Sequence, residues 1–180
     1  LTGGNIGIDR CTVNALFNAS GIFSNDAKID IGVLTSAGQH GMRNFATFNN
    51  NSGGEINIDG TTTSALYNTS SVAYHAAFTN AGSIKIGAAS SVGQYGLWNQ
   101  SDFYNNAGGE IRIDRASSYG LNNNIGTYAT GYFDNFATID LGAVASPGNK
   151  GLFNEGTFNN NVGSELHIDR STDTGLWNFA

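Results

Sequence analysis

Pairs of aliphatic residues, in the pattern aliphatic-x-aliphatic, recur along the whole chain at nearly constant spacing. The pairs are Ile6/Ile8, Ile29/Ile31, Ile56/Ile58, Ile84/Ile86, Ile111/Ile113, Ile139/Leu141 and Leu166/Ile168. From Ile29 onward their first members recur in alternate steps of about 27 and about 28 residues, so two repeats make a 55-residue unit. Repetition at such a period is typical of solenoids, in which each coil buries its apolar side chains only against its neighbours.

Two further motifs, Gly/Ala-Leu-x-Asn and Phe-x-Asn, follow the aliphatic pairs with the same period. The central apolar residues of the first are Leu16, Met42, Leu66, Leu97, Leu121, Leu152 and Leu176, and the second begins at Phe23, Phe48, Phe78, Phe103, Phe133 and Phe158. The residue inside each aliphatic pair and inside each Phe-x-Asn is mostly polar. Because side chains alternate between the two faces of a strand, each motif predicts a short strand with its apolar residues facing inward.

Composition supports strands and turns, since the chain is rich in Gly, Asn, Ser, Thr, Ile and Phe. We predict an all-β, three-sided parallel β-helix (β-solenoid) whose coils contain about 27–28 residues each. Each strand pairs in parallel with its equivalent one coil away, in the right-handed sense usual for parallel crossovers. We expect residues 1–180 to form a single solenoid segment. The lack of an initiator methionine and of capped ends leads us to expect a fragment of a longer repeat protein.

Asparagines end both the second and the third motif in every coil where these occur. They are Asn18, Asn44, Asn68, Asn99, Asn123, Asn154 and Asn178, and then Asn25, Asn50, Asn80, Asn105, Asn135 and Asn160. Asparagine tolerates left-handed backbone and bonds its own main chain, which suits a corner between strands. Amides stacked from coil to coil also bond one another, so we predict two asparagine ladders.

The charge pattern narrows the possible partners. The net charge is −6, and the 8 Lys and Arg residues are scattered singly, so no basic stripe is available for nucleic acid. No apolar run approaches the roughly 20 residues that a membrane-spanning helix needs. We therefore expect neither nucleic acid nor a membrane span in this segment.

The acidic residues follow the repeat instead of converging on one place. Glu55, Glu110 and Glu165 recur with the 55-residue unit, and so do Asp59, Asp114 and Asp169. A catalytic site requires a local departure from the period, so we interpret these residues as a solvated face and predict no catalytic residue. We also expect Arg112 to pair with Asp140 on the next coil.

Metal and cofactor sites are not expected either. The histidines, His40, His75 and His167, occupy three different repeat positions, so no simple registration of coils brings them together. The Gly-Gly-x-Gly-x-Asp repeat that binds calcium in other β-rolls is missing. We predict no metal ligand and no cofactor.

One position of the second motif stands out as a candidate binding surface. The residue between Leu and Asn should turn outward, and five of its seven occupants are aromatic: Phe17, Tyr67, Trp98, Phe153 and Trp177. An exposed aromatic column indicates self-association with another chain or contact with glycans. Alternatively, the longer connections from Thr69 to Ala77 and from Asn124 to Tyr132 fold back over the column. Their covering residues would then be Tyr74, Tyr128 and Tyr132.

The segment from Phe103 to Ile111 combines Phe-x-Asn-Asn with Gly-Gly-Glu-Ile. In this the chain resembles the parallel β-helical passenger and stalk regions of large secreted bacterial adhesins and autotransporter-type proteins. The resemblance implies an extracellular or cell-surface setting and a role in adhesion, rigid display or the building of an appendage. It also implies that other copies or subunits of the same surface assembly are the partners.

We therefore expect a non-catalytic structural segment of a bacterial adhesin or extracellular fibre. The alternative is a carbohydrate-binding or carbohydrate-cleaving parallel β-helix, such as a polysaccharide lyase, a glycosidase or a tailspike-like protein, because these share the same architecture.

Overall fold

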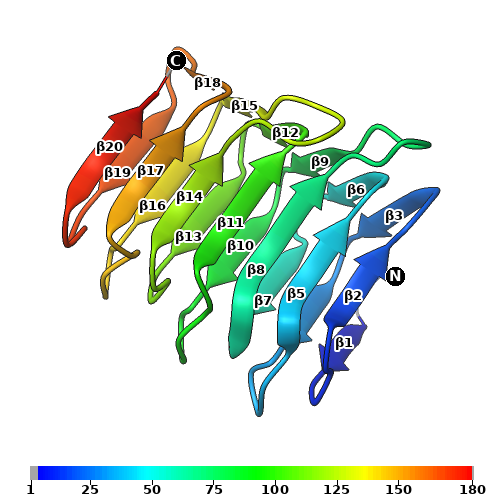
Figure 1. Ribbon diagram of the computed structural model, residues 1–180. Helices are drawn as coiled ribbons and strands as arrows, with labels where there is room; N and C mark the ends of the chain where they lie inside the picture. The colour runs from blue at the N-terminus through cyan, green and yellow to red at the C-terminus, as the bar shows by residue number, and fades with distance from the viewer. Residues whose placement is uncertain (1–3, 180) are drawn as a thin grey trace.

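A computed structural model describes residues 4–179, which form a stack of parallel coils built from strands (Figure 1). Residues 1–3 and 180 of the predicted segment lie outside the described residues. Sheet A contains β1 (Asn5–Ile8), β4 (Lys28–Ile31), β7 (Glu55–Ile58), β10 (Ser83–Ile86), β13 (Glu110–Ile113), β16 (Thr138–Leu141) and β19 (Glu165–Ile168). Sheet B contains β2 (Asn14–Asn18), β5 (Gly38–Asn44), β8 (Thr61–Thr69), β11 (Tyr95–Gln100), β14 (Tyr119–Asn123), β17 (Lys150–Asn154) and β20 (Thr174–Asn178). Sheet C contains β3 (Ile22–Asn25), β6 (Thr47–Asn50), β9 (Ala77–Asn80), β12 (Asp102–Asn105), β15 (Tyr132–Asn135) and β18 (Thr157–Asn160).

The register of all three sheets places each motif residue on its equivalent in the next coil. Ile56 aligns with Ile84, Leu66 with Leu97, and Phe78 with Phe103, always between parallel strands. The predicted three-sided β-solenoid, with its coils of about 27 residues, is thus confirmed. No helix that could span a membrane is found in residues 4–179.

The phenylalanines of sheet C form a stack along the middle of the molecule. Successive rings from Phe23 to Phe158 lie 4.7–5.1 Å apart between centroids and are nearly parallel. The interior members are fully buried together with the isoleucine pairs of sheet A and the leucines of sheet B. Stacked aromatic pairs of this kind contribute roughly 0.5–1.5 kcal/mol beyond the burial of their surface.

Both predicted asparagine ladders are present. In each ladder the Nδ2 of one asparagine donates to the Oδ1 of the next, at 2.7–2.9 Å, from Asn18 to Asn178 and from Asn25 to Asn160. Most of these amides also donate to a backbone carbonyl, for example Asn99 to Ser101 O. The ladders therefore satisfy polar groups that the corners of each coil bury.

The expected left-handed backbone at these asparagines is wrong. Among residues 4–179 the non-glycine residues with positive φ are Arg10, Arg115 and Arg170, at the corner between sheets A and B. Gly60 occupies the equivalent place in another coil, with φ of 62°. Asparagine is thus required at its own corners for its side-chain bonds and not for its backbone freedom.

The 55-residue unit arises from alternating corner lengths around a constant interior. Between sheets C and A, short corners at 26–27, 81–82 and 136–137 alternate with longer ones at 51–54, 106–109 and 161–164. Between sheets B and C, the longest corners are 70–76 and 124–131, which stand out from the edge of the stack (Figure 1). Corner length therefore decides where the surface is hollowed.

Candidate binding surface

Sheet B places all five predicted aromatic residues in one column on its outer face. Phe17, Arg43, Tyr67, Trp98, Asn122, Phe153 and Trp177 follow one another in register. Tyr67, Trp98 and Phe153 are half-buried, whereas Phe17 and Trp177, near the two ends, are 48% and 40% exposed. Their role in binding or self-association stays a prediction.

A second outward column, which the sequence analysis missed, runs beside the first. It lies two residues before the central apolar residue of the motif and includes His40, Tyr95, Tyr119 and Lys150. The tyrosines in neighbouring coils were a usable signal, since Tyr95 and Tyr119 occupy the same repeat position. Two consecutive residues of the motif separate the two outward columns, and both are buried, as Gly96 and Leu97 show.

Rings from the two columns stack on one another. Trp98 lies 4.3 Å from Tyr67 and 4.5 Å from Tyr95 between centroids, in both cases nearly parallel, and Tyr95 stacks on Tyr119 at 5.3 Å. These contacts use the ring faces on which a sugar would lie. The interior of the column is therefore stabilised by its own stacking.

Two cations lie within this aromatic surface. The Arg43 guanidinium is 4.5 Å from the centroid of Phe45 and 5.4 Å from that of Tyr67, and the Lys150 ammonium is 4.6 Å from that of Trp177. Each such contact is worth about 0.5–1 kcal/mol at partly exposed sites. Lys150 also pairs with Asp173 at 3.5 Å, whereas Arg43 takes part in none of the ion pairs found among residues 4–179.

The long loops flank the aromatic column and leave it uncovered in part. Tyr132 belongs to β15 of sheet C, where its hydroxyl donates to Asp134, so the expectation that it covers the column is wrong. Tyr74 and Tyr128 are 49% and 60% exposed. The loop 124–131 is fixed at its base by Trp98, whose Nε1 donates to Asn124 Oδ1 at 3.0 Å.

A groove of about 310 Å³ lies between these loops beside the column. We call it the loop groove, and its lining includes Arg43, Tyr67, Thr69, Gln100, Val72 and Tyr128. Tyr67 donates its hydroxyl to Gln100 Oε1 at 2.7 Å, which leaves the Gln100 amide nitrogen with a weak contact to Ile125 O at 3.5 Å. The groove thus combines one cation with hydroxyl, amide and apolar groups.

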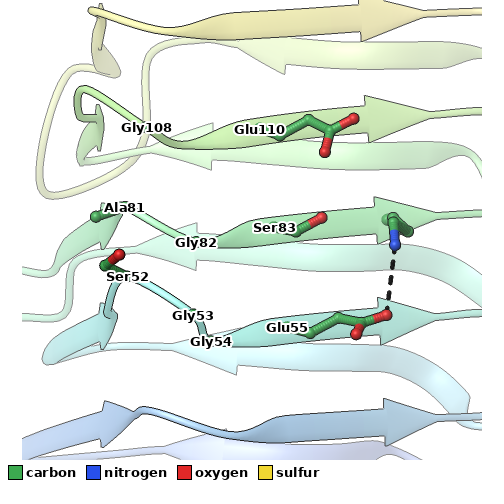
Figure 2. Close-up of a pocket in the computed structure, with 10 residues that line it drawn as sticks. Ser52, Gly53, Gly54, Glu55, Ala81, Gly82, Ser83, Gly108 and Glu110 are labelled. Atoms are coloured by element: carbon green, nitrogen blue, oxygen red, sulfur yellow. Dashed lines mark hydrogen bonds and ion pairs between the residues drawn. The ribbon is translucent and has the colours of Figure 1, made fainter.

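Further hollows lie at the corner between sheets C and A. Figure 2 shows one of about 300 Å³, in which Glu55, Ser83 and Glu110 extend from consecutive strands and Lys85 pairs with Glu55 at 3.4 Å. A hydrogen bond from Asn57, helped by Lys85, holds the pKa of Glu55 below its usual value. A hollow of about 490 Å³ occupies the equivalent place one unit later. These hollows arise from the short corners, and no group of three or more potential metal ligands is found in residues 4–179.

Asp59 and Asp114 are not part of a solvated face, which corrects that prediction for these two residues, whereas Asp169 in the last coil is exposed. Asp59 and Asp114 are 2% and 1% exposed. The Oδ1 of Asp114 accepts backbone N–H groups from Val144 and Ala145 at 2.9 and 2.8 Å, and Asp59 binds the turn of another coil in the same way. Carboxylates that accept two backbone N–H groups tie adjacent corners together.

The predicted ion pair between Arg112 and Asp140 is wrong, although the two residues are adjacent in register. The Nε of Arg112 donates to Asp114 Oδ2 at 3.1 Å on its own coil. Asp140 pairs with His167 at 2.7 Å on the other side. The choice among equally near partners depends on side-chain conformation, which register does not determine.

The fold defines the chain as a parallel β-solenoid repeat protein whose described coils share one interior. Comparison with protein-family models, with curated proteins and with solved structures gives no match.

Proposed function

We propose that this chain is a non-catalytic structural repeat segment of a large secreted or cell-surface bacterial protein, either an adhesin or an extracellular fibre or appendage. The observation that carries the proposal is the continuity of the two asparagine ladders, from Asn18 to Asn178 and from Asn25 to Asn160, without a break. A scaffold of this kind gains length by adding coils, and the bonds between neighbouring coils keep it stiff.

The interactions between coils suit a load-bearing rod. Each interface combines backbone bonds in three parallel sheets with side-chain bonds in two ladders and one aromatic stack. Separating two neighbouring coils therefore requires backbone bonds, ladder bonds and an aromatic contact to break. Such a segment would hold a terminal domain at a fixed distance from the cell.

The surface supports the same proposal. Its glutamates recur with the 55-residue unit, and the hollows at the corner between sheets C and A recur with them. Repeated features serve a function that is distributed along a fibre, whereas catalysis requires unlike groups at one point. We propose other subunits of the same assembly as partners, in contact with the aromatic column.

Labelling of intact cells tests the proposed location. Antibodies raised against this chain should bind the surface of the bacterium that encodes it without permeabilisation, and antibodies against a cytosolic protein should not. Labelling only after lysis would contradict the proposal. The flanking gene sequence provides a second test, because a fibre or stalk requires further 55-residue units, whereas an enzyme requires a non-repeating insert with clustered Asp, Lys or Arg.

A further inference from the structure

The loop groove carries a feature that a structural role does not need. We propose that it binds a carboxylated sugar unit of an acidic polysaccharide, with the Arg43 guanidinium as the group that recognises the carboxylate. This inference goes beyond the proposed structural function and is tested on the isolated chain, so the cellular location of the protein has no bearing on it.

Arg43 is a cation held in place without an anionic partner. Its guanidinium lies 4.5, 5.4 and 6.0 Å from the ring centroids of Phe45, Tyr67 and Phe17. Its Nε is buried and has no hydrogen-bond partner among the described residues. A guanidinium carries five N–H donors, and no ion pair with a described residue occupies those of Arg43, which leaves the N–H groups of its terminal nitrogens for a ligand.

Six of the other seven basic side chains have their charges or donors in use, and the seventh, Arg10, lies away from the groove. Lys28, Lys85, Arg112 and Lys150 form ion pairs with carboxylates. Arg115 and Arg170 each donate to two backbone carbonyls at the corner between sheets A and B, and Arg10 is exposed there. Among the residues that line the loop groove, Arg43 is the one basic residue, and none of them is acidic. An anion therefore has one complementary charge in this groove.

The remaining lining groups fit a sugar. Gln100 offers its amide N–H groups to sugar hydroxyls, whereas the hydroxyl of Thr69 is buried and donates to Gln100 Oε1 at 3.3 Å. Val72 and Tyr128, which are 86% and 60% exposed, form apolar walls. Tyr128 takes part in none of the aromatic pairs found among residues 4–179, so its ring face is free for the C–H face of a sugar. A volume of about 310 Å³ lies at the lower end of the range for small-ligand sites.

The single charge also decides which anion fits best. Nucleic acids and polyphosphates gain affinity by neutralising several adjacent phosphates, which one arginine does not provide. A hexuronate carries one carboxylate, several hydroxyls and an apolar face, which complement the Arg43 cation, the Gln100 amide and the apolar walls of the loop groove. An acidic peptide supplies the carboxylate without the hydroxyl pattern.

Calorimetric titration of the 180-residue chain with trigalacturonate tests the proposal, with its neutral trimethyl ester as the matched ligand. We expect trigalacturonate to bind at least about tenfold more tightly than the ester, and added salt to weaken its binding, because partly exposed charges are screened. Arg43→Gln should lower the affinity about tenfold or more, and Tyr128→Ala about threefold or more. Lys28→Gln makes the same change in net charge on sheet A, away from the groove, and should leave the affinity unchanged.

Circular dichroism and thermal melting identify any variant that does not fold, and Tyr128→Ala, in an exposed loop, remains informative if Arg43→Gln fails. Equal affinity for acid and ester, equal loss in the Arg43 and Lys28 variants, or no binding at millimolar ligand would each overturn the proposal. Tighter binding of a tetraglutamate peptide than of trigalacturonate would overturn the sugar assignment and indicate a protein partner.

Discussion

Asn68 and Asn99 face each other across adjacent coils, with the Nδ2 of Asn68 donating to the Oδ1 of Asn99 at 2.8 Å. Both side chains are fully buried. Asn68 also donates to Asp102 O, and Asn99 to Ser101 O and Tyr132 O. Each amide therefore joins two corners and two coils at once.

Replacing Asn99 with alanine should lower the free energy of unfolding by roughly 2–4 kcal/mol. The change leaves the buried Oδ1 of Asn123 without its donor and removes the amide bonds to the carbonyls of Ser101 and Tyr132. An unsatisfied buried group costs about 1–3 kcal/mol, and each further lost hydrogen bond about 0.5–1.5 kcal/mol. Urea denaturation measures the difference. Asn149 is exposed, so Asn149→Ala should change stability by less than about 0.5 kcal/mol. Equal effects of the two substitutions would show that the ladder contributes little.

Phe103→Ala should destabilise the chain by about 3–5 kcal/mol, the usual cost of truncating a buried aromatic residue. Phe103 is fully buried and stacks on Phe78 and Phe133 at 4.8 and 4.7 Å, so its removal leaves a cavity that neither neighbour can fill alone. Phe136, at 45% exposure, provides the control, and Phe136→Ala should have little effect on the urea midpoint. A loss below about 1 kcal/mol for Phe103→Ala would contradict the described packing.

Two glycines with the same backbone conformation should respond very differently to alanine. Gly53 and Gly87 have φ of 84° and 67°, so both substitutions incur the cost of left-handed backbone, roughly 1–2 kcal/mol. At Gly53 the new Cβ meets no atom within 4 Å, whereas at Gly87 it would collide with the backbone oxygen of Asp114. Thermal melting should show a moderate loss for Gly53→Ala and loss of folding, or a much larger loss, for Gly87→Ala. Similar melting temperatures would mean that the corner at Gly87 is less tight than described.

The pair of His167 and Asp140 should make stability depend on pH. The hydrogen bond that the His167 imidazole donates to the Asp140 carboxylate, together with the charge of that carboxylate, raises the pKa of His167 above 6.5. Because the folded state binds this proton more tightly than the unfolded chain, the stabilisation is complete below the unfolded pKa and is lost as pH rises through the folded pKa. His167→Gln should therefore lower stability more at pH 5.5 than at pH 8.5.

Denaturation at these two pH values measures the effect, and Asp140→Asn is the control background. In that background the pH-dependent cost of His167→Gln should disappear. An NMR titration of His167 should also show a lower pKa once Asp140 is replaced. Persistence of the pH dependence without Asp140 would assign it to another group.

The interior of this protein could be predicted from sequence because its residues recur at a fixed spacing and alternate between the inner and outer faces of each strand. Inward residues such as Ile56 and Phe78 recur in register, and alternation within a strand determines which face they occupy. The asparagine ladders follow in the same way, since a buried amide at a repeated corner meets its own copy. The outward column of Tyr67 and Trp98 was predicted by the same alternation.

The surface was harder to predict because it depends on the corners. The burial of Asp114 requires a turn from another coil to present two N–H groups, which depends on loop conformation. The ion pair between Arg112 and Asp114 likewise depends on side-chain geometry that repetition does not specify. The exposed position of Tyr128 depends in the same way on the geometry of its projecting loop. Arg43 was located in its column, but its unpaired state becomes visible only in three dimensions.

The alternation of short and long corners restricts how such a chain can lengthen or shorten. If a single coil were deleted, the isoleucines and phenylalanines of the coils on either side would still stack on one another. Two corners of the same length would then be neighbours, and the projecting loops beyond the deletion would shift by one coil, which is half of the repeat unit. Deleting two consecutive coils preserves both the interior and the spacing of surface features. Gain and loss of coils in pairs would therefore change the reach of the rod while leaving unchanged what a partner meets along its side.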